Sequence, residues 1–260
     1  MTPELIPLML AVLSGGIVAL LLTLFGGGGS VLAVPLLLYV VGVTDPHVAI
    51  GVSAAGVALN ALTALAGHAK AGRVRWPCAT LFAVAGAAGA WFGSSLAKMI
   101  DGHQLLLIFA VAMAAVGLSM LRSRAVVIRP EPRLTLAMAP GLGLAGAGVG
   151  SAAGFFGIGG GFLIVPGLMA STGMGLATAQ ATSLLSVAAF GATTAGNYAL
   201  SGWVDPALVA AMAVGGIAGT AAGLPLAGRL GTNAVLGRTL FAGLILLVAG
   251  YVAVRAVAAP

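Results

Sequence analysis

Two glycine-rich segments are the parts of this chain whose composition and spacing could do chemistry. Residues 25–35 contain four consecutive glycines followed by Ser30, and residues 156–166 contain a glycine triplet. Glycine is unfavourable inside a helix, so we expect a helix to break at each segment and restart within it. The first amides of a restarted helix lack intrahelical partners and carry partial positive charge, so two such ends can bind a small anion. The predicted donors are the amides of Gly28, Gly29, Ser30, Gly159, Gly160 and Gly161.

Two structural interpretations compete with an anion site. A Gly-Gly-Gly-Gly-Ser run has the composition of a flexible linker, and glycines also let helices pack closely without any ligand.

Each restarted helix has only about 12 residues before the next loop, which corresponds to roughly 18 Å, or half a membrane. No Lys or Arg lies deep in an apolar run, so backbone amides are the donors that the sequence offers at that depth.

Polar side chains inside otherwise apolar runs are further candidates for ligand contact. They are costly in a hydrocarbon environment unless they face a cavity or a partner. A Ser or Thr often only bonds to the carbonyl of the preceding helical turn, so each hydroxyl also has a structural interpretation. His68, beside Lys70 at the end of an apolar run, is interpreted as structural. The candidates are Ser53, Asn60, Gln180, Thr182, Ser183 and Asn197.

The composition indicates that membrane helices must position these residues. Only 6% of the 260 residues are charged, 60% are hydrophobic, and the mean hydropathy is +1.16. The charges lie almost entirely between apolar runs that are long enough to cross about 30 Å of hydrocarbon. These runs are continuous rather than alternating, which favours helices over strands. The sequence therefore predicts an all-α polytopic integral membrane protein.

One unit occurs twice in the chain. Residues 25–35 match residues 156–166, and further along Ser53 matches Ser183 and Gly93 matches Gly223. The expected parts are a first membrane repeat over 1–121, a linker over 122–133 and a second repeat over 134–260. If each broken run crosses the membrane once, the chain has eight spans and the two copies are parallel. If each broken run crosses as two half-helices, the chain has ten passes and the copies are inverted. The predicted runs are 5–42, 47–67, 77–97 and 104–121, then 134–173, 176–198, 206–227 and 234–254.

The basic residues predict which loops lie in the cytoplasm. Lys70, Arg73 and Arg75 lie in one loop, and the linker carries four arginines, so both are expected on the cytoplasmic side. The net charge of +6 then reflects orientation in the membrane, and no nucleic-acid partner is expected.

The first apolar run has no preceding Lys or Arg, so it is expected to stay in the mature protein. Cys78 is the single cysteine, which excludes an internal disulfide, and no metal or cofactor is expected.

The duplicated pattern Phe-Gly-x-Gly-Gly-Gly/Ser followed by Val-Pro resembles the sulfite exporter TauE/SafE family. Residues 156–166 are the better match, because Ser30 replaces the third glycine of the triplet in the first copy. The resemblance covers nearly the whole chain. It implies a multi-pass carrier of the bacterial inner membrane for small sulfur-containing anions such as sulfite or sulfonates, without identifying the anion.

Three classes of function can be compared. A secondary transporter, with a small anionic substrate and the lipid bilayer as its partners, is the interpretation that uses both glycine breaks. An intramembrane enzyme would need a nucleophile and base, or a carboxylate pair, at membrane depth. The acids and histidines lie in or beside loops, so the protein is not expected to be an enzyme. A structural or assembly subunit of a membrane complex is the alternative, and the sequence leaves open whether the chain forms a homodimer.

Overall fold

A computed structural model describes residues 5–122, 138–157, 161–230 and 234–258, and these residues form helices and short connections without a β-strand. In chain order, the elements are α1 (Leu5–Phe25), η1 (Gly26–Leu32, a 3₁₀-helix), α2 (Ala33–Leu36), η2 (Leu37–Val41, a π-helical turn), α3 (Pro46–Lys70), α4 (Trp76–Ala97), α5 (Gly102–Arg122), α6 (Ala139–Phe156), α7 (Gly161–Thr172), α8 (Leu176–Ala199), α9 (Pro206–Leu230) and α10 (Ala234–Ala258).

Six helical segments have the length and hydropathy of membrane spans: Leu5–Phe25, Pro46–Lys70, Trp76–Ala97, Ala139–Phe156, Leu176–Ala199 and Pro206–Ala227. Shorter apolar helical segments are Gly28–Val41, Gly102–Ala115, Leu163–Thr172 and Ala242–Arg255. The predicted all-helical, polytopic architecture is therefore confirmed, whereas the count of eight spans stays a prediction.

Each glycine-rich segment ends a long helix and leads into a shorter one that returns beside it. Gly26 follows α1 with φ of +64°, and Gly157 caps α6 with φ of +65°. Only glycine adopts this left-handed conformation without a steric penalty, which explains why these helices end here. A Cβ on Gly29 would meet the backbone of Leu21 and Leu22, so η1 packs directly on α1, and α7 likewise contacts α6. In each broken run, the chain therefore turns back and the shorter helical segment packs beside the long helix.

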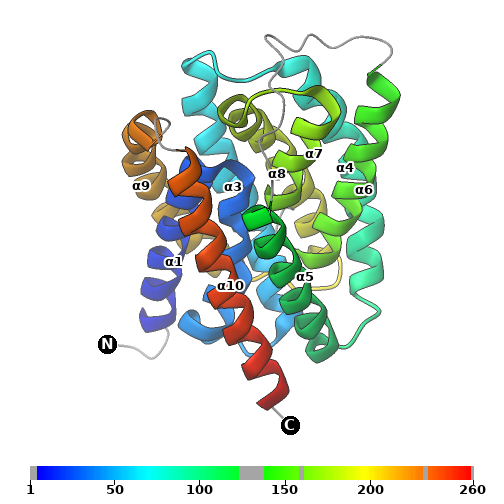
Figure 1. The fold of residues 1–260 in the computed structure, drawn as a ribbon. Coiled ribbons are helices and arrows are strands. Elements are labelled where there is room, and N and C mark those ends of the chain that lie inside the picture. Colours follow the sequence, from blue (N-terminus) through cyan, green and yellow to red (C-terminus); the bar gives the residue numbers. More distant parts are fainter. Residues whose placement is uncertain (1–4, 123–137, 158–160, 231–233, 259–260) are drawn as a thin grey trace.

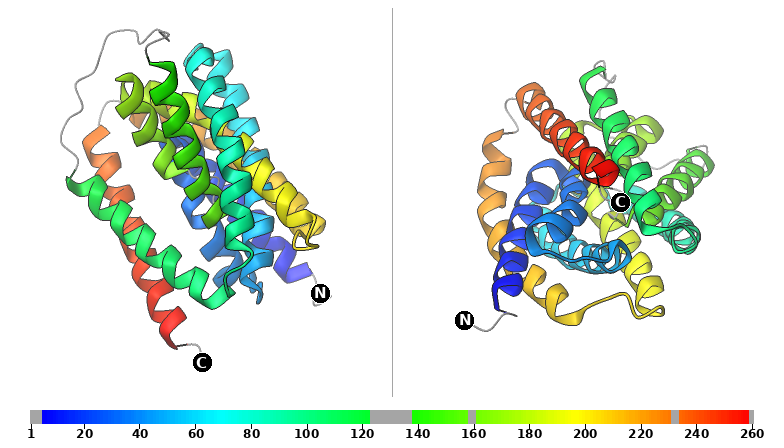
Figure 2. Two further views of the ribbon diagram at one scale, coloured as in Figure 1. Left: turned by 90° about the vertical axis from the view of Figure 1, so that its right-hand side faces the viewer. Right: turned by 90° about the horizontal axis from the view of Figure 1, so that it is seen from below.

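The two halves of the chain start from opposite ends of the bundle. In Figure 1, α1 starts at the bottom beside the N-terminus, whereas α6 starts at the top. Between the two halves, α3 contacts α8 and α5 contacts α10. Figure 2 shows the α5–α10 pair at one edge of the molecule. The inverted alternative expects such opposite starts, and the division into two repeats stays a prediction.

Glycine rows bring α4 into backbone contact with α6, and α1 into backbone contact with α9. A Cβ on Gly89 would meet the carbonyl oxygen of Ala147, and one on Gly93 would meet that of Ser151. In the other pair, a Cβ on Gly219 would meet the carbonyl of an α1 glycine. Small residues at this spacing allow helix backbones to approach closely, so these glycines have a packing role.

The charged residues of the described helices lie near the two ends of the bundle. Asp45, Asp101 and Asp205 precede α3, α5 and α9, where their Oδ1 atoms accept the backbone N–H of His47 at 2.8 Å, His103 at 2.9 Å and Ala207 at 2.8 Å. This is the usual N-cap arrangement, which stabilises a helix start. Lys70, the last residue of α3, lies at the opposite end together with Arg73 and Arg75 of the α3–α4 connection.

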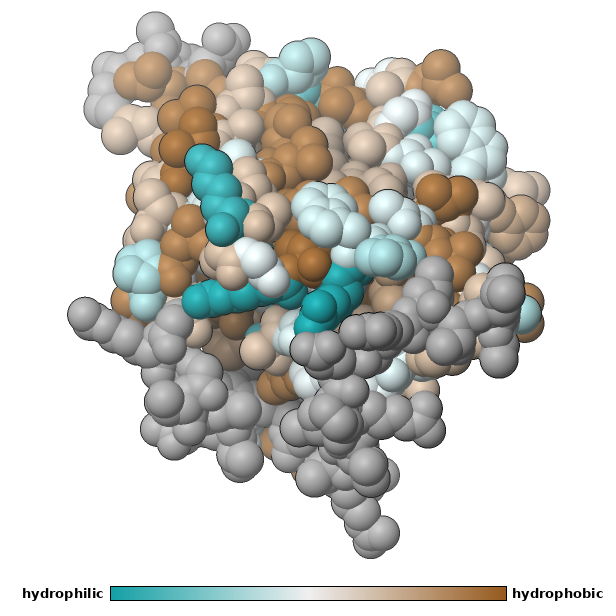
Figure 3. All heavy atoms as spheres, turned by 90° about the horizontal axis from the view of Figure 1, so that it is seen from above, coloured by the Kyte–Doolittle hydropathy of each residue, from teal (hydrophilic) through white to brown (hydrophobic). Residues whose placement is uncertain are grey.

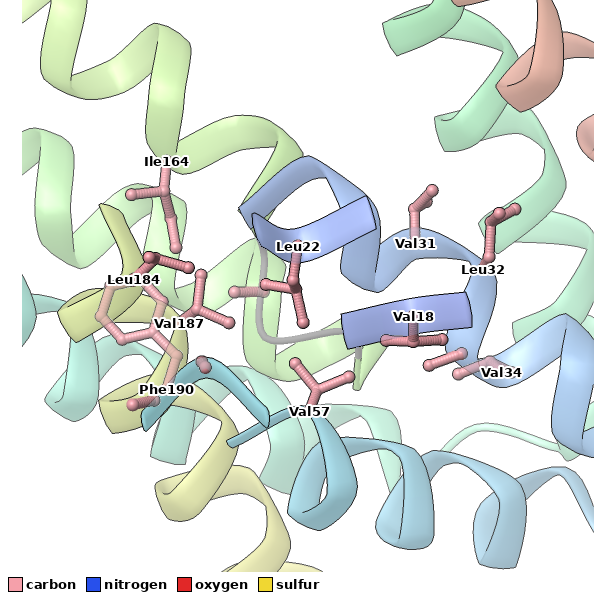
Figure 4. Packing of buried hydrophobic residues seen from close by; sticks show 14 of the residues in the cluster. Val18, Leu22, Val31, Leu32, Val34, Val57, Ile164, Leu184, Val187 and Phe190 are labelled. Carbon is pink, nitrogen blue, oxygen red and sulfur yellow. The ribbon is translucent and has the colours of Figure 1, made fainter. Parts of the chain in front are cut away.

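Apolar side chains fill the centre of the bundle. Figure 4 shows Leu22 of α1, Val57 of α3, Ile164 of α7, and Val187 and Phe190 of α8 packed in one cluster. All five side chains are completely buried. The returning half-helices are therefore held between long helices by close packing.

Candidate functional site

The break after α1 lies against the opposite half of the chain. A Cβ on Gly26 would lie only 2.8 Å from Cα of Gln180 in α8, so the two backbones are in contact. Both the close approach and the left-handed φ exclude a larger residue at this position. Gly26 was not among the site residues predicted from the sequence. Its position directly after the aromatic residue of the motif, Phe25, could have identified it.

The break after α6 has the corresponding contacts on α3. A Cβ on Gly157 would meet the side chain of Ile50, which precedes Ser53 by three residues. Ser53 is completely buried, and its hydroxyl donates a hydrogen bond to the carbonyl oxygen of Gly157 at 3.1 Å. Ser53 therefore fixes the carbonyl of the left-handed residue and thereby the direction in which the chain leaves α6.

The predicted amide donors lie only partly within the described residues. Gly28, Gly29 and Ser30 belong to η1 and are buried, whereas Gly159 and Gly160 lie outside the described residues. Gly161 is the first residue of α7. The two half-helices η1 and α7 contact each other, so the structure brings the two glycine-rich segments into one region. Gly29 also has a packing role against α1, and its role in binding stays a prediction.

Three of the predicted polar residues lie in α8 near the break at Gly26. Gln180 supplies the backbone against which Gly26 packs. Ser183 donates from its hydroxyl to the carbonyl of Gln180 at 2.8 Å, which is the local bond that the structural interpretation expects. Thr182 accepts the backbone N–H of Arg75 at 3.2 Å, so its hydroxyl connects α8 to the α3–α4 loop.

Asn60 lies apart from both breaks. Its Nδ2 donates to the carbonyl oxygen of Gly15 in α1 at 3.3 Å, and its buried Oδ1 has no hydrogen-bond partner among the described residues. A Cβ on Gly216 of α9 would meet the Asn60 side chain, and a Cβ on Gly86 of α4 would meet the ring of Phe190 in the same way. Asn60 and Phe190 thus occupy corresponding packing positions, although only one of them is polar.

Asn197 anchors a cation at the end of the bundle where the acids lie. The side-chain amide of Asn197 donates to Ser94 Oγ at 2.7 Å and Ser95 Oγ at 2.9 Å. Its Oδ1 accepts a hydrogen bond from Lys98 Nζ at 2.7 Å, and Lys98 also donates to Ser201 Oγ at 3.1 Å. Lys98 lies where α4 and α8 both end, so two negative helix ends stabilise its charge. These contacts of Asn197 therefore connect α8 to α4.

Sequence reasoning missed the contact between His68 and the helix that ends at the first break. His68 of α3 is only 6% exposed, and its Nε2 lies 3.3 Å from the carbonyl oxygen of Thr23, which precedes Gly26 by three residues. The position of His68 beside Lys70 had suggested an interfacial residue. In the part of the chain that the structure describes, His, Cys, Asp and Glu do not form a group of three that could hold a metal ion.

Comparison with known proteins identifies the family. The model of the family described as "Sulfite exporter TauE/SafE" matches residues 11–252. A "Probable membrane transporter protein" of Xylella fastidiosa is 47% identical over 246 residues, which cover 94% of each chain. The "Probable membrane transporter protein YdhB" of Bacillus subtilis is 26% identical over 233 residues, covering 85% of this chain and 92% of its own. No solved structure matches the chain. The chain, a multi-pass membrane protein, belongs to the sulfite exporter TauE/SafE family of membrane transporters.

Proposed function

We propose that this protein is a secondary transporter that carries small anions, in particular sulfur-containing oxyanions or organosulfonates, across the bacterial inner membrane. The observation that carries the proposal is the pair of glycine breaks, each of which lies against a helix of the other half of the chain. The half-helices that follow the breaks contact each other. Half-helix N-termini that meet within a bilayer suit an anionic ligand, because their free amides and helix dipoles favour negative charge.

The proposal includes two inverted repeats, 1–121 and 134–260, joined by the basic linker 122–133 and making ten passes when half-helices are counted. The packing of the helices supports this symmetry. The contact of α1 with α9 corresponds to that of α6 with α4, and the contact of α3 with α9 corresponds to that of α8 with α4. Exchanging the halves therefore maps these contacts onto one another. Inverted repeats are a common basis for alternating access, in which helix groups rock around a central site.

The apolar centre defines what must move during transport. Leu22, Val57 and Val187 are completely buried between the two breaks, so the described conformation offers an ion no polar route through this cluster. The closely packed pairs α1–α9 and α4–α6 are suited to moving as rigid units, because their backbones are in direct contact. Their relative motion would open the cluster towards one face at a time.

Flux measurements test the proposal directly. The purified protein in liposomes should give saturable flux of at least one of sulfite, thiosulfate or a short alkanesulfonate, because the family description names sulfite. Sulfate, whose sulfur has a higher oxidation state than that of sulfite, tests whether the protein selects the lower oxidation state. Choline in the same liposomes serves as a cationic control. Folded protein that gives no saturable flux of any of these anions would contradict the proposal and would favour the alternative of a structural or assembly subunit.

The orientation is tested by cysteine labelling in intact cells. In a Cys78→Ser background, single cysteines at Arg73 and Arg129 should resist an impermeant thiol reagent, because the α3–α4 loop and the linker are predicted to be cytoplasmic. Ser201→Cys is the matched control, since Ser201 is exposed beside the capped helix start of α9 at the opposite end. Labelling at Arg73 and Arg129 together with protection at Ser201 would reverse the orientation.

A further inference from the structure

We propose that the α3–α4 loop and the first turn of α8 form an anion-binding site at the predicted cytoplasmic face, where a small oxyanion binds before it reaches the break at Gly26. The site is a cavity of about 320 Å³ lined by Gly72, Arg73, Arg75, Ala177 and Thr178. One water molecule takes up about 30 Å³ in the liquid, so the cavity has room for a small anion with part of its hydration shell. This inference rests on the proposed function and adds a point of entry to it.

The backbone of the loop is held in place, which keeps both arginines at the cavity. Gly72 turns the chain with φ of +67°, and the N–H of Arg73 donates to the carbonyl of His68 at 3.1 Å. Val74 is buried, and the N–H of Arg75 donates to Thr182 Oγ1 at 3.2 Å. Buried Val74 anchors the loop between the two arginines, whose own side chains are exposed.

The charges around the cavity favour an anion. The acids within the described residues, Asp45, Asp101 and Asp205, cap helices at the other end of the bundle. Arg73 and Arg75 therefore have no described carboxylate near them. Figure 3, which shows the molecule from above, places a group of hydrophilic side chains on this face among apolar surroundings. Guanidinium groups bind oxyanions through paired hydrogen bonds, so two of them on one cavity fit a sulfite-like ligand.

The first turn of α8 adds to the effect of the arginines. Ala177 and Thr178 belong to this turn and line the same cavity. The N-cap residue Gly175 provides no side-chain acceptor for the first amides of the helix. These amides and the Thr178 hydroxyl are donors on the side of the cavity opposite the loop, and the helix dipole there also favours negative charge.

The cavity lies close, along α8, to the residue against which the first glycine break packs. Thr178 precedes Gln180 by two residues, and the Gln180 backbone is the surface against which Gly26 packs. Thr182, one helical turn after Thr178, bonds to the Arg75 backbone. Along the axis of α8, the cavity therefore lies within about one helical turn of the residue that contacts the first break. If the arginines served only to keep this loop in the cytoplasm, they could lie anywhere in the loop. Their position at a cavity near the break is not needed for that role.

The test compares charge-neutralising variants in the same loop. In inside-out membrane vesicles, Arg73→Gln/Arg75→Gln should raise the KM for radiolabelled sulfite presented at the cytoplasmic face by about tenfold or more, with kcat within about twofold of wild type. Lys70→Gln is the matched control, because Lys70 is an exposed cation at the end of α3, next to this loop, and does not line the cavity; its KM should change by less than about twofold. An equal rise in KM in both variants would overturn the site and leave a general charge effect.

A second variant and a second measurement separate this inference from the proposed function. Arg73→Lys/Arg75→Lys keeps the loop charge and the orientation but loses the paired hydrogen bonds, so it should still raise KM by about threefold. In a Trp91→Phe/Trp203→Phe background, Trp76 next to Arg75 is the remaining tryptophan. Iodide should quench Trp76 fluorescence more strongly in the wild-type loop than in Arg73→Gln/Arg75→Gln, sulfite should compete with the quenching, and acrylamide quenching should not differ. Equal iodide quenching in both proteins would overturn the site, whether or not sulfite is transported.

Discussion

Replacing Gly157 with valine is expected to abolish transport and to lower the thermal stability of the purified protein. Gly157 has φ of +65°, which costs about 1–2 kcal/mol for a residue with a Cβ and more for a β-branched one. A Cβ there would also meet Ile50 on α3. The chain could then no longer turn from α6 into α7 at the same place, so the second half-helix would lose its orientation. Liposome flux and thermal unfolding of the purified protein measure the two effects separately.

Gly148→Val in the same helix is the matched control for this variant. Gly148 is an exposed residue of α6, and a Cβ there would meet no atom within 4 Å. Its flux and thermal stability should therefore stay close to those of wild type. Wild-type flux in Gly157→Val would contradict the assignment of the break to the transport route. From the sequence, we also expect Gly160→Val to abolish substrate binding; Gly160 lies outside the described residues, so this stays a prediction.

Gly219→Leu is expected to prevent stable folding, with a loss of at least about 3 kcal/mol in the free energy of unfolding. A Cβ on Gly219 would meet the carbonyl oxygen and Cα of Gly16, and backbone atoms cannot move aside as a flexible side chain can. The α1–α9 pair would have to separate, which removes close packing along both helices. The measurement is thermal unfolding in detergent together with the yield of monodisperse protein.

Gly243→Leu in α10 controls for adding a large apolar residue to a membrane helix. A Cβ at Gly243 would meet no atom within 4 Å, so this variant should remain folded and active. Gly223→Ala should be milder than Gly219→Leu, because its nearest neighbour is the side chain of Thr23 rather than a backbone carbonyl. If Gly219→Leu were as stable as Gly243→Leu, close backbone contact would not be what holds α1 and α9 together.

Much of the fold could be predicted from the sequence because hydrophobic runs and glycine breaks report directly on membrane helices. The predicted runs 47–67, 77–97, 176–198 and 206–227 fall within α3, α4, α8 and α9. The direction of the two halves could not be predicted, since it depends on whether a broken run crosses once or turns back. That turn is made by single left-handed residues, Gly26 and Gly157, which composition does not distinguish from their neighbours.

The candidate site was harder to predict because polarity alone does not say which neighbour a side chain meets. Ser53 and Asn60 are both polar candidates in α3, yet Ser53 contacts the break at Gly157 whereas Asn60 contacts α1. Asn197 bonds to α4 and Lys98. These partners are more than forty positions away along the chain, so they depend on how the helices assemble. The periodicity of a single helix carries no information about that assembly.

The separation of charge to the two ends of the bundle determines how the membrane potential acts on transport. Asp45, Asp101 and Asp205 cap helices at one end, and no Asp, Glu, Lys or Arg of the described residues lies midway along a span. The potential therefore acts mainly on the charge of the substrate. It contributes about 2.3 kcal/mol per elementary charge for each 100 mV, so a divalent anion gains about 4.6 kcal/mol on leaving a cell that is negative inside. That energy corresponds to a concentration ratio of roughly 2,000. A passive carrier with this arrangement of charges is thermodynamically sufficient for anion export, without a coupling ion.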